Sequence, residues 1–270
     1  MSKELNILFI PVSAVGHVNG CIGLAEVLIQ SGHSVSFAVN HEWKGRLAKY
    51  GIREILLADL QNEHGAEHGA QSTKAMAKMM MGLGKDSTPL DKAVNMVTKM
   101  GDLFINKIKQ IDDLVSGVIA SLQPDVLFVD MPFLLPSVVK SGIPWVLVST
   151  ANPLRYLNDE RTPPPLSESS HLNIYGYPLE LDYTDIRPLP PKWYRFDNLK
   201  RTEKHIPFNL PIQLMDKPGK LIYFSLGSMG AADVDNMKRL VNVLSKSKHR
   251  FIVSKGPLHD EYSLADNMWG

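Results

Sequence analysis

One histidine and one aspartate have the side chains that acid–base chemistry needs, and each follows an apolar run. His17 lies in the small-residue stretch Pro11 to Gly20, directly after the apolar run Leu5 to Ile10. Asp130 closes a later run, Asp125 to Asp130. The carboxyl ends of parallel strands share one edge of an α/β sheet, where ligands bind. The pattern therefore predicts a histidine base at this edge, with Asp130 as an orienting carboxylate.

Both residues also have an ordinary structural interpretation. A lone histidine in a turn is commonly a surface or capping residue, and an aspartate after a strand is commonly the N-cap of the next helix. We expect the helix that follows the turn to disfavour an imidazolium at His17, which leaves a neutral imidazole able to accept a proton. The residues alone leave both interpretations open.

A second small-residue turn, Gly227-Ser228-Met229-Gly230, lies between the apolar run Lys220 to Leu226 and a helical segment, Asp233 to Lys246. Backbone amides at such a turn, together with the helix dipole and the Ser228 hydroxyl, could bind a phosphate. The turn matches neither the phosphate-loop motif nor the dinucleotide glycine motif. Taken alone it is weak evidence, because many α/β turns of this kind bind nothing.

Three other patterns predict no chemistry. Asp233-Val-Asp235 resembles the Asp-x-Asp of metal-dependent sugar transferases, but it opens a predicted helix, where carboxylates complement the dipole. Glu63-His64 with Glu67-His68 lies in a polar segment that we expect to be a solvated loop. Gly82-Leu-Gly84-Lys85 lacks the Ser or Thr that follows lysine in a phosphate loop. We therefore expect no metal site.

The elements that position these residues follow from the apolar runs. Strands are predicted at residues 5–10, 34–40, 53–58, 125–130 and 144–149, and helices at 21–30, 42–50, 72–83, 90–122 (broken near Gly117) and 132–141. This order calls for a parallel sheet with helices on both faces. Prolines cluster from Ala151 to Pro218, which predicts a long connecting region and not a folding unit. A strand at 220–226, a helix at 233–246 and a strand at 250–254 then begin a similar second unit.

Composition limits the class of protein. A chain of 270 residues suits two domains, and a net charge of +1 predicts neither a nucleic acid nor an anionic membrane as partner. Cys21 is the only cysteine, so no intrachain disulfide can form, which favours a cytoplasmic location. No apolar run approaches the ~20 residues of a membrane span. The methionines from Met76 to Met81, with Met96 and Met100, are either helix core or an adaptable wall for an apolar ligand.

The residues resemble a known family. The stretches Gly16 to Leu28 and Ser31 to Phe37 resemble the start of small-molecule UDP-glycosyltransferases, especially arthropod members. Asp130, Arg161-Thr-Pro-Pro-Pro165 and Phe224-Ser-Leu-Gly-Ser228 follow in matching order. Gly20 departs from the pattern, since many members carry proline there. The sequence also stops at Trp269-Gly270, before the family's donor signature.

The resemblance implies an α/β fold of the GT-B type, with two facing Rossmann-like domains and the second one truncated. The acceptor-binding domain would occupy residues 1–210, including the proline-rich connecting region from about 151, and the nucleotide-sugar domain would begin at 218–270. His17 would deprotonate an acceptor hydroxyl, with support from Asp130. Gly16, Gly227 and Ser228 would contact the donor.

The implied reaction moves a hexose from a UDP-sugar, expected to be UDP-glucose, to a small lipophilic acceptor with inversion and without metal or cofactor. The family resemblance also suggests a role in detoxification. Because most of the donor signature is absent, we expect the chain alone to be inactive. A non-catalytic module that binds hydrophobic small molecules is the alternative. A nucleotide-dependent oxidoreductase is disfavoured, since the first turn lacks the glycine motif.

Overall fold

The computed structural model describes residues 3–57, 105, 108–131, 133–150, 153, 168–183, 189–203 and 207–270. These residues form two compact units, one containing the described residues up to 203 and the other those from 207 onward. Each unit is built around a parallel sheet flanked by helices.

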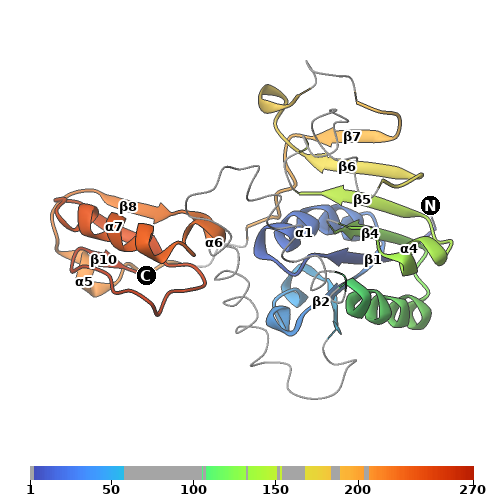
Figure 1. Ribbon diagram of the computed structural model, residues 1–270, viewed down its shortest axis with the longest axis horizontal. Helices are drawn as coiled ribbons and strands as arrows, with labels where there is room; N and C mark the ends of the chain where they lie inside the picture. Colours follow the sequence, from blue (N-terminus) through green and yellow to red (C-terminus); the bar gives the residue numbers. More distant parts are fainter. Residues whose placement is uncertain are drawn as a thin grey trace. The chain divides into compact units, whose positions relative to one another are not determined.

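The first unit contains a seven-stranded sheet in the order β3-β2-β1-β4-β5-β6-β7 (Figure 1). Every neighbouring pair is parallel. β1 and β5 are buried along nearly their whole length, which explains their continuous apolar sequences. The strands are β1 Asn6–Pro11, β2 Ser34–Val39, β3 Arg53–Leu56, β4 Val126–Asp130, β5 Trp145–Ser149, β6 Leu172–Gly176 and β7 Trp193–Phe196.

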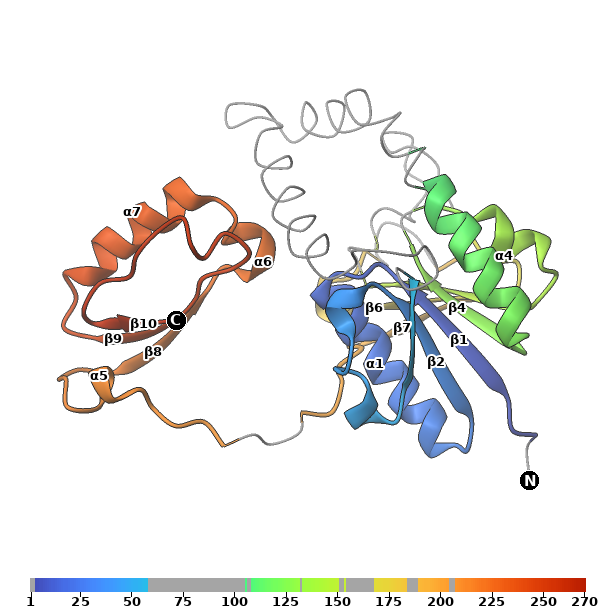
Figure 2. The same cartoon turned by 90° about the horizontal axis from the view of Figure 1, so that it is seen from below.

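Helices cover both faces of this sheet (Figure 2). Alternate residues of β1 point to opposite faces, so Phe9 packs with helix α1 (Val15–Gln30), and Ile10 packs with a helix at residues 108–122 and with α4 (Pro136–Lys140). The five strands predicted before residue 150 are confirmed, as is the short helix at α4. Among the described residues, no helix has both the length and the apolar character needed to cross a membrane.

Two helix predictions in this unit are wrong. The segment predicted as one helix at 42–50 forms two short 3-10 helices, η1 His41–Trp43 and η2 Ala48–Tyr50. Their path is set by tertiary contacts, since the Trp43 Nε1–H donates to the Ser13 carbonyl at 3.0 Å. The helix at 108–122 continues through Gly117, where exposed glycine lowers helix propensity without breaking the hydrogen-bonded ladder.

The prediction that residues 151–218 are only a connector is also wrong. β6, the 3-10 helix η5 (Leu179–Leu181) and β7 belong to this stretch, and both strands extend the sheet. A buried asparagine, Asn173, interrupts the apolar pattern of β6. Its side chain accepts a hydrogen bond from Ser169 N at 2.7 Å and donates to Ser169 O at 2.9 Å. This local pairing satisfies a polar residue in the core, which hydrophobic patterning cannot anticipate.

Helix α1 begins at Val15, six residues before the predicted start at Cys21. Gly16 and Gly20 have low helix propensity and suggested a turn. The packing explains the second glycine, because a Cβ at Gly20 would lie 2.7 Å from Thr150 Cγ2. Likewise, a Cβ at Gly23 would lie 2.8 Å from the carbonyl carbon of Lys200. Tertiary packing therefore overrides local propensity here.

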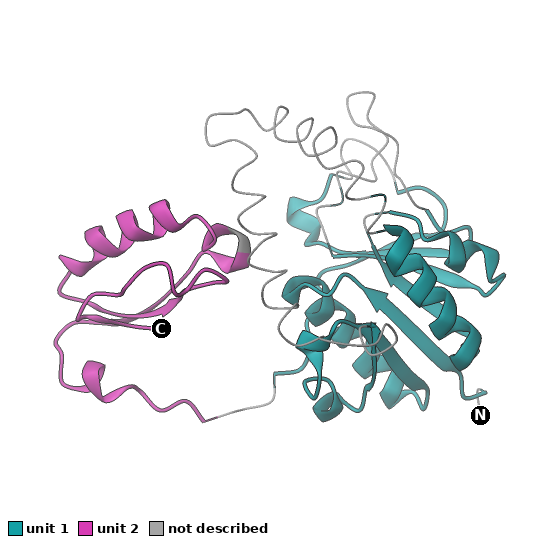
Figure 3. Cartoon of the chain, turned by 60° about the horizontal axis from the view of Figure 1, so that its bottom comes forward, with its two compact units in different colours: residues 1–66, 103–203 teal, residues 67–102, 204–270 magenta. Residues whose placement is uncertain are grey.

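The second unit contains a three-stranded parallel sheet in the order β10-β9-β8, with α7 packed on it (Figure 3). The predicted strands at β8 and β9 and the helix at α7 are confirmed. Asp233 caps α7 by accepting a hydrogen bond from Asn236 N at 3.1 Å, which confirms its helix-opening role. The elements are α5 Ile212–Met215, β8 Leu221–Ser225, α6 Gly227–Gly230, α7 Val234–Ser245, β9 Arg250–Ser254 and β10 Met268–Trp269.

Candidate active site

The structure brings His17 and Asp130 together at the carboxyl edge of the seven-stranded sheet. β1 and β4 are neighbours, and the last residue of β4 is Asp130. His17 lies in the first turn of α1, which follows β1. Its Nδ1 lies 2.9 Å from Asp130 Oδ2, and the two side chains are 32% and 6% exposed. The alternative that Asp130 caps the next helix is wrong, because the N-cap of α4 is Leu135.

A third residue, Thr150, completes this cluster. Its Oγ1 lies 2.8 Å from His17 Nδ1 and 2.8 Å from Asp130 Oδ2. The threonine hydroxyl donates its single proton to the carboxylate. The His17 Nδ1–H is then shared between two acceptors, Asp130 Oδ2 and Thr150 Oγ1. This network assigns the proton to Nδ1 and leaves the Nε2 lone pair to accept another.

Sequence analysis did not identify Thr150, although a signal for it was present. It is the first residue after β5, which neighbours β4 in the sheet. The rule that selected Asp130 as a polar residue at the carboxyl end of a strand would also have selected Thr150.

The electrostatics of His17 differ from the prediction. The hydrogen bond from its ring to the Asp130 carboxylate raises the pKa of His17, and the negative charge of Asp130 adds to that effect, while partial burial opposes it. The prediction that the helix N-terminus favours the neutral imidazole is therefore wrong in direction, because the adjacent carboxylate outweighs it. A raised pKa makes Nε2 a stronger proton acceptor once the ring is neutral.

The neighbouring thiol of Cys21 has a different character. It is completely buried, and burial raises its pKa well above the ordinary value, with a further contribution from Asp130. A buried, protonated thiol is a poor nucleophile. The chemistry of this site therefore belongs to the imidazole and not to the cysteine.

Beside the cluster lies a cavity of about 350 Å³. Thr150 is part of both, and Gly16, another predicted site residue, also lines the cavity. The remaining walls come from α1, the end of β6 and the segment after β7. The other lining residues are Asn19, Gly20, Gly176, Asp197, Asn198, Leu199, Lys200, Arg201 and Glu203.

The other two predicted site residues lie in the second unit. Gly227 and Ser228 form the start of α6, one residue after the end of β8, so they lie at the carboxyl end of that strand. Gly227 has φ +69°, a left-handed conformation that favours glycine, and its N–H donates to Ser225 Oγ at 3.2 Å. Ser228 is exposed.

The remaining candidates lie outside the described residues. They are the methionines from Met76 to Met81, Met96 and Met100, the segment Glu63 to His68, the segment Gly82 to Lys85 and Arg161 to Pro165. Predictions about them stay predictions. Within the described ranges, no group of three or more His, Cys, Asp or Glu side chains could hold a metal ion.

Comparison with known proteins identifies the fold. No protein-family model and no curated protein sequence matches the chain. Solved structures do match, among them the glycosyltransferase SnogD from Streptomyces nogalater, at 15% identity and a TM-score of 0.54, covering 99% of this chain and 71% of that one. A glycotransferase of kitacinnamycin matches at 12% identity and a TM-score of 0.58, with coverages of 99% and 71%.

Arabidopsis thaliana UGT89C1, solved in complex with quercetin, matches at 16% identity and a TM-score of 0.54, covering 93% of this chain and 65% of that one. The same plant enzyme has been solved with UDP-L-rhamnose. At such low identities the likeness concerns the fold. The chain therefore has the α/β architecture of GT-B glycosyltransferases, in agreement with the predicted fold class.

Proposed function

We propose that this chain is a UDP-glycosyltransferase that moves a hexose to a hydroxyl group of a small lipophilic acceptor. The observation that carries the proposal is the cluster of His17, Asp130 and Thr150 at the carboxyl edge of the sheet. It has the parts that general base catalysis needs: a half-buried imidazole, a carboxylate that fixes its tautomer and, in that tautomer, an Nε2 lone pair that can accept a proton. The glycosyltransferases with the same fold support this choice.

In the proposed reaction, His17 Nε2 takes the proton of the acceptor hydroxyl as its oxygen attacks the anomeric carbon. The new bond forms opposite the leaving group, so the configuration inverts. The anomeric C–O bond breaks, and UDP leaves with the electron pair. Asp130 stabilises the imidazolium that results, as the carboxylate of a catalytic triad does. No step needs a metal ion.

The donor would be a UDP-sugar, and UDP-glucose is the first choice. We propose that the backbone amides near Gly227, the Ser228 hydroxyl and Gly16 contact it. The acceptor would lie near His17, with the methionine segment as an adaptable apolar wall. A cytoplasmic location and a role in detoxifying lipophilic compounds complete the proposal.

Substitution of the histidine tests it. In a version of the protein that contains a complete donor site, which the transfer assays here and below use, we expect His17→Ala to lower the rate of hexose transfer from UDP-glucose to phenolic acceptors by about 10²- to 10⁴-fold, the usual contribution of a general base. Acceptor affinity, measured by titration without donor, should change little. The matched control is His171→Ala, since His171 is exposed and lies outside the cluster.

Two results would contradict the proposal. Undiminished transfer by a folded His17→Ala variant would remove the histidine from the mechanism. Acceptor binding without any transfer by the version with a complete donor site, under all donors tried, would favour the hydrophobic binding module instead.

A further inference from the structure

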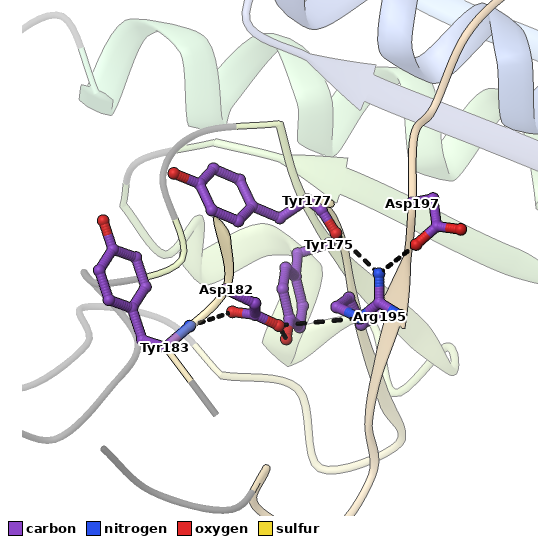
Figure 4. Close-up of polar contacts among 6 residues, drawn as sticks. All are labelled: Tyr175, Tyr177, Asp182, Tyr183, Arg195 and Asp197. Atoms are coloured by element: carbon purple, nitrogen blue, oxygen red, sulfur yellow. Dashed lines mark hydrogen bonds and ion pairs between the residues drawn. The ribbon is translucent and has the colours of Figure 1, made fainter. Parts of the chain in front are cut away.

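A polar network at the carboxyl ends of β6 and β7 includes Asp197 (Figure 4). Asp197 also lines the cavity beside the His17 cluster. We propose that this cavity binds the hydroxyl groups of a sugar ring, and that the Asp197 carboxylate, held in place by Arg195, is their main acceptor. The inference rests on the proposed function, because it assigns a substrate group to a place beside the proposed base.

The partly buried Arg195 side chain positions the carboxylate of Asp197 by a hydrogen bond. Its Nη1 donates to Asp197 Oδ1 at 2.5 Å and to the carbonyl of Tyr177 at 2.9 Å. The Arg195 side chain is 20% exposed, whereas that of Asp197 is 73% exposed. The carboxylate is therefore fixed on its protein side and open on its cavity side. An accepting group that is already positioned loses little conformational entropy when a ligand binds.

Arg195 is in turn held by a buried carboxylate, Asp182. Its Nε lies 3.8 Å from Asp182 Oδ2, and the Asp182 side chain is 2% exposed. Asp182 also accepts hydrogen bonds from the Tyr175 hydroxyl at 2.6 Å and from Tyr183 N at 2.8 Å. Burial raises the pKa of Tyr175, so its hydroxyl stays protonated and remains a donor. Every buried charge in this network has a partner, which favours one fixed arrangement.

The outer wall of the cavity is also fixed. It is the extended segment 197–203, which crosses α1 at Gly23, where a Cβ would lie 2.8 Å from the backbone of Lys200. At Gly20 a Cβ would lie 3.8 Å from Leu199 Cβ, an ordinary contact. The Arg201 Nη1 donates to Asn19 Oδ1 at 2.8 Å, and Thr202 N donates to Glu26 Oε2 at 2.6 Å. Because glycine has no side chain, Gly23 lets the segment lie close against α1.

The lining of the cavity indicates the class of ligand. Two cationic and two anionic side chains line it, Lys200 and Arg201 with Asp197 and Glu203, so it offers no net charge to a phosphate. Two amides, Asn19 and Asn198, add donors and acceptors, and Leu199 is the large apolar side chain among the lining residues. A lipophilic acceptor would displace water from these polar groups without offering them a hydrogen bond in return. A neutral ring with several hydroxyls can both donate to the carboxylates and accept from the amides.

Such hydroxyls could come from two sources: the hexose of a nucleotide-sugar donor, or a hexose already attached to an acceptor. The shared chemistry is a sugar ring within reach of Asp197. Because Thr150 lies in both the cavity and the His17 cluster, the ring would lie beside this cluster.

The experiment compares the affinities of the full chain for UDP, UDP-glucose and methyl β-glucoside, measured by calorimetric or ligand-observed NMR titration. We expect Asp197→Asn to weaken binding of UDP-glucose by about 10- to 100-fold, the worth of hydrogen bonds to a charged group, and to leave UDP unchanged. The matched control is Asp216→Asn, an exposed aspartate of the second unit, which should change neither affinity. Asp197→Glu keeps the charge but moves it by one methylene, so an intermediate loss is expected.

The outcomes separate the sources and the alternatives. A loss confined to methyl β-glucoside would support the sugar site and assign it to a glycosylated acceptor. An equal loss for UDP and UDP-glucose, no loss for any probe, or full wild-type affinity in Asp197→Glu would overturn the proposal. The His17→Ala variant tests a different step, the transfer itself. Failure of that variant to slow transfer would therefore contradict the proposed function without affecting this binding result.

Discussion

The chain contains two strand-to-helix openings that look alike in sequence and differ in structure: β1 with α1, and β8 with α6. β1 lies inside a seven-stranded sheet between β2 and β4, and five of its six residues are buried. β8 lies at the edge of a three-stranded sheet, and none of its five residues is buried. The first opening ends in a charged hydrogen-bonded cluster, whereas the second ends in an exposed serine.

The difference in burial explains why the two openings can support different chemistry. At the end of β1, neighbouring strands bring Asp130 and Thr150 to His17, and restricted solvent strengthens their interaction. After β8, the described residues provide backbone N–H groups and the neutral hydroxyl of Ser228 as hydrogen-bonding groups for a ligand. The first arrangement can move a proton, and the second can at most hold a ligand. The following predictions test this difference.

Substitution of the aspartate should produce the largest effect. We expect Asp130→Asn to lower the rate of transfer by about 10³- to 10⁴-fold, because it removes the charge that fixes the Nδ1–H tautomer and stabilises the imidazolium. The double variant His17→Ala/Asp130→Asn should be no slower than the slower single variant, since the two residues act as a unit. Transfer assays under matched conditions would measure this, and multiplicative losses would place Asp130 in a separate role.

The pH dependence of transfer should follow the charge on His17. The imidazole must be neutral to accept a proton, so the rate should rise with pH through the pKa of His17, which Asp130 raises above its ordinary value. Removing the negative charge in Asp130→Asn should lower that pKa and move the acidic limb of the residual activity to lower pH. A limb that stays in place, in a profile of kcat/KM against pH, would mean that another group titrates.

Two glycine substitutions compare the helices on opposite faces of the first unit. We expect Gly23→Ala to destabilise the fold by about 1–3 kcal/mol, because the new Cβ meets the backbone of Lys200 at 2.8 Å. Gly117→Ala should instead stabilise it by roughly 0.5–1 kcal/mol, since nothing lies within 4 Å of that Cβ. Denaturant titrations would measure both. Equal effects of the two changes would show that the segment after β7 does not depend on close approach to α1.

These glycines also show where sequence analysis reached its limit. Apolar runs predicted β1 to β5, β8 and β9. Continuous apolar sequences are typical of buried parallel strands, and β1, β2 and β5 are buried along nearly their whole length. The start of α1 was not predicted, because its glycines are explained only by packing against residues far along the chain, such as Thr150 and Lys200. β6 and β7 were missed because prolines surround them and Asn173 occupies a buried position.

Some features of the candidate site could be predicted from the sequence and others could not. The pairing of His17 with Asp130 followed from one rule about strand ends, and the structure confirms their contact. The sign of the pKa shift at His17 could not follow from that rule, because it depends on the hydrogen bond from the ring to Asp130, whose Oδ2 lies 2.9 Å from Nδ1, and on the charge of that carboxylate. The network around Asp182 and Arg195 depends on side chains brought together by β6 and β7, which the sequence did not reveal.

The smallest effect is expected at the second opening. Ser228 is exposed and offers one neutral hydroxyl, whose net contribution to binding a phosphate is about 0.5–1.5 kcal/mol. Ser228→Ala should therefore raise the KM for UDP-glucose by about tenfold or less and leave kcat nearly unchanged, because the hydroxyl takes no part in proton transfer. The matched control is Ser245→Ala, at the last residue of α7, where the hydroxyl bonds within its own helix to Asn242 O at 2.8 Å. A loss of kcat in Ser228→Ala comparable to that of His17→Ala would break the comparison, since it would place essential chemistry at the end of β8.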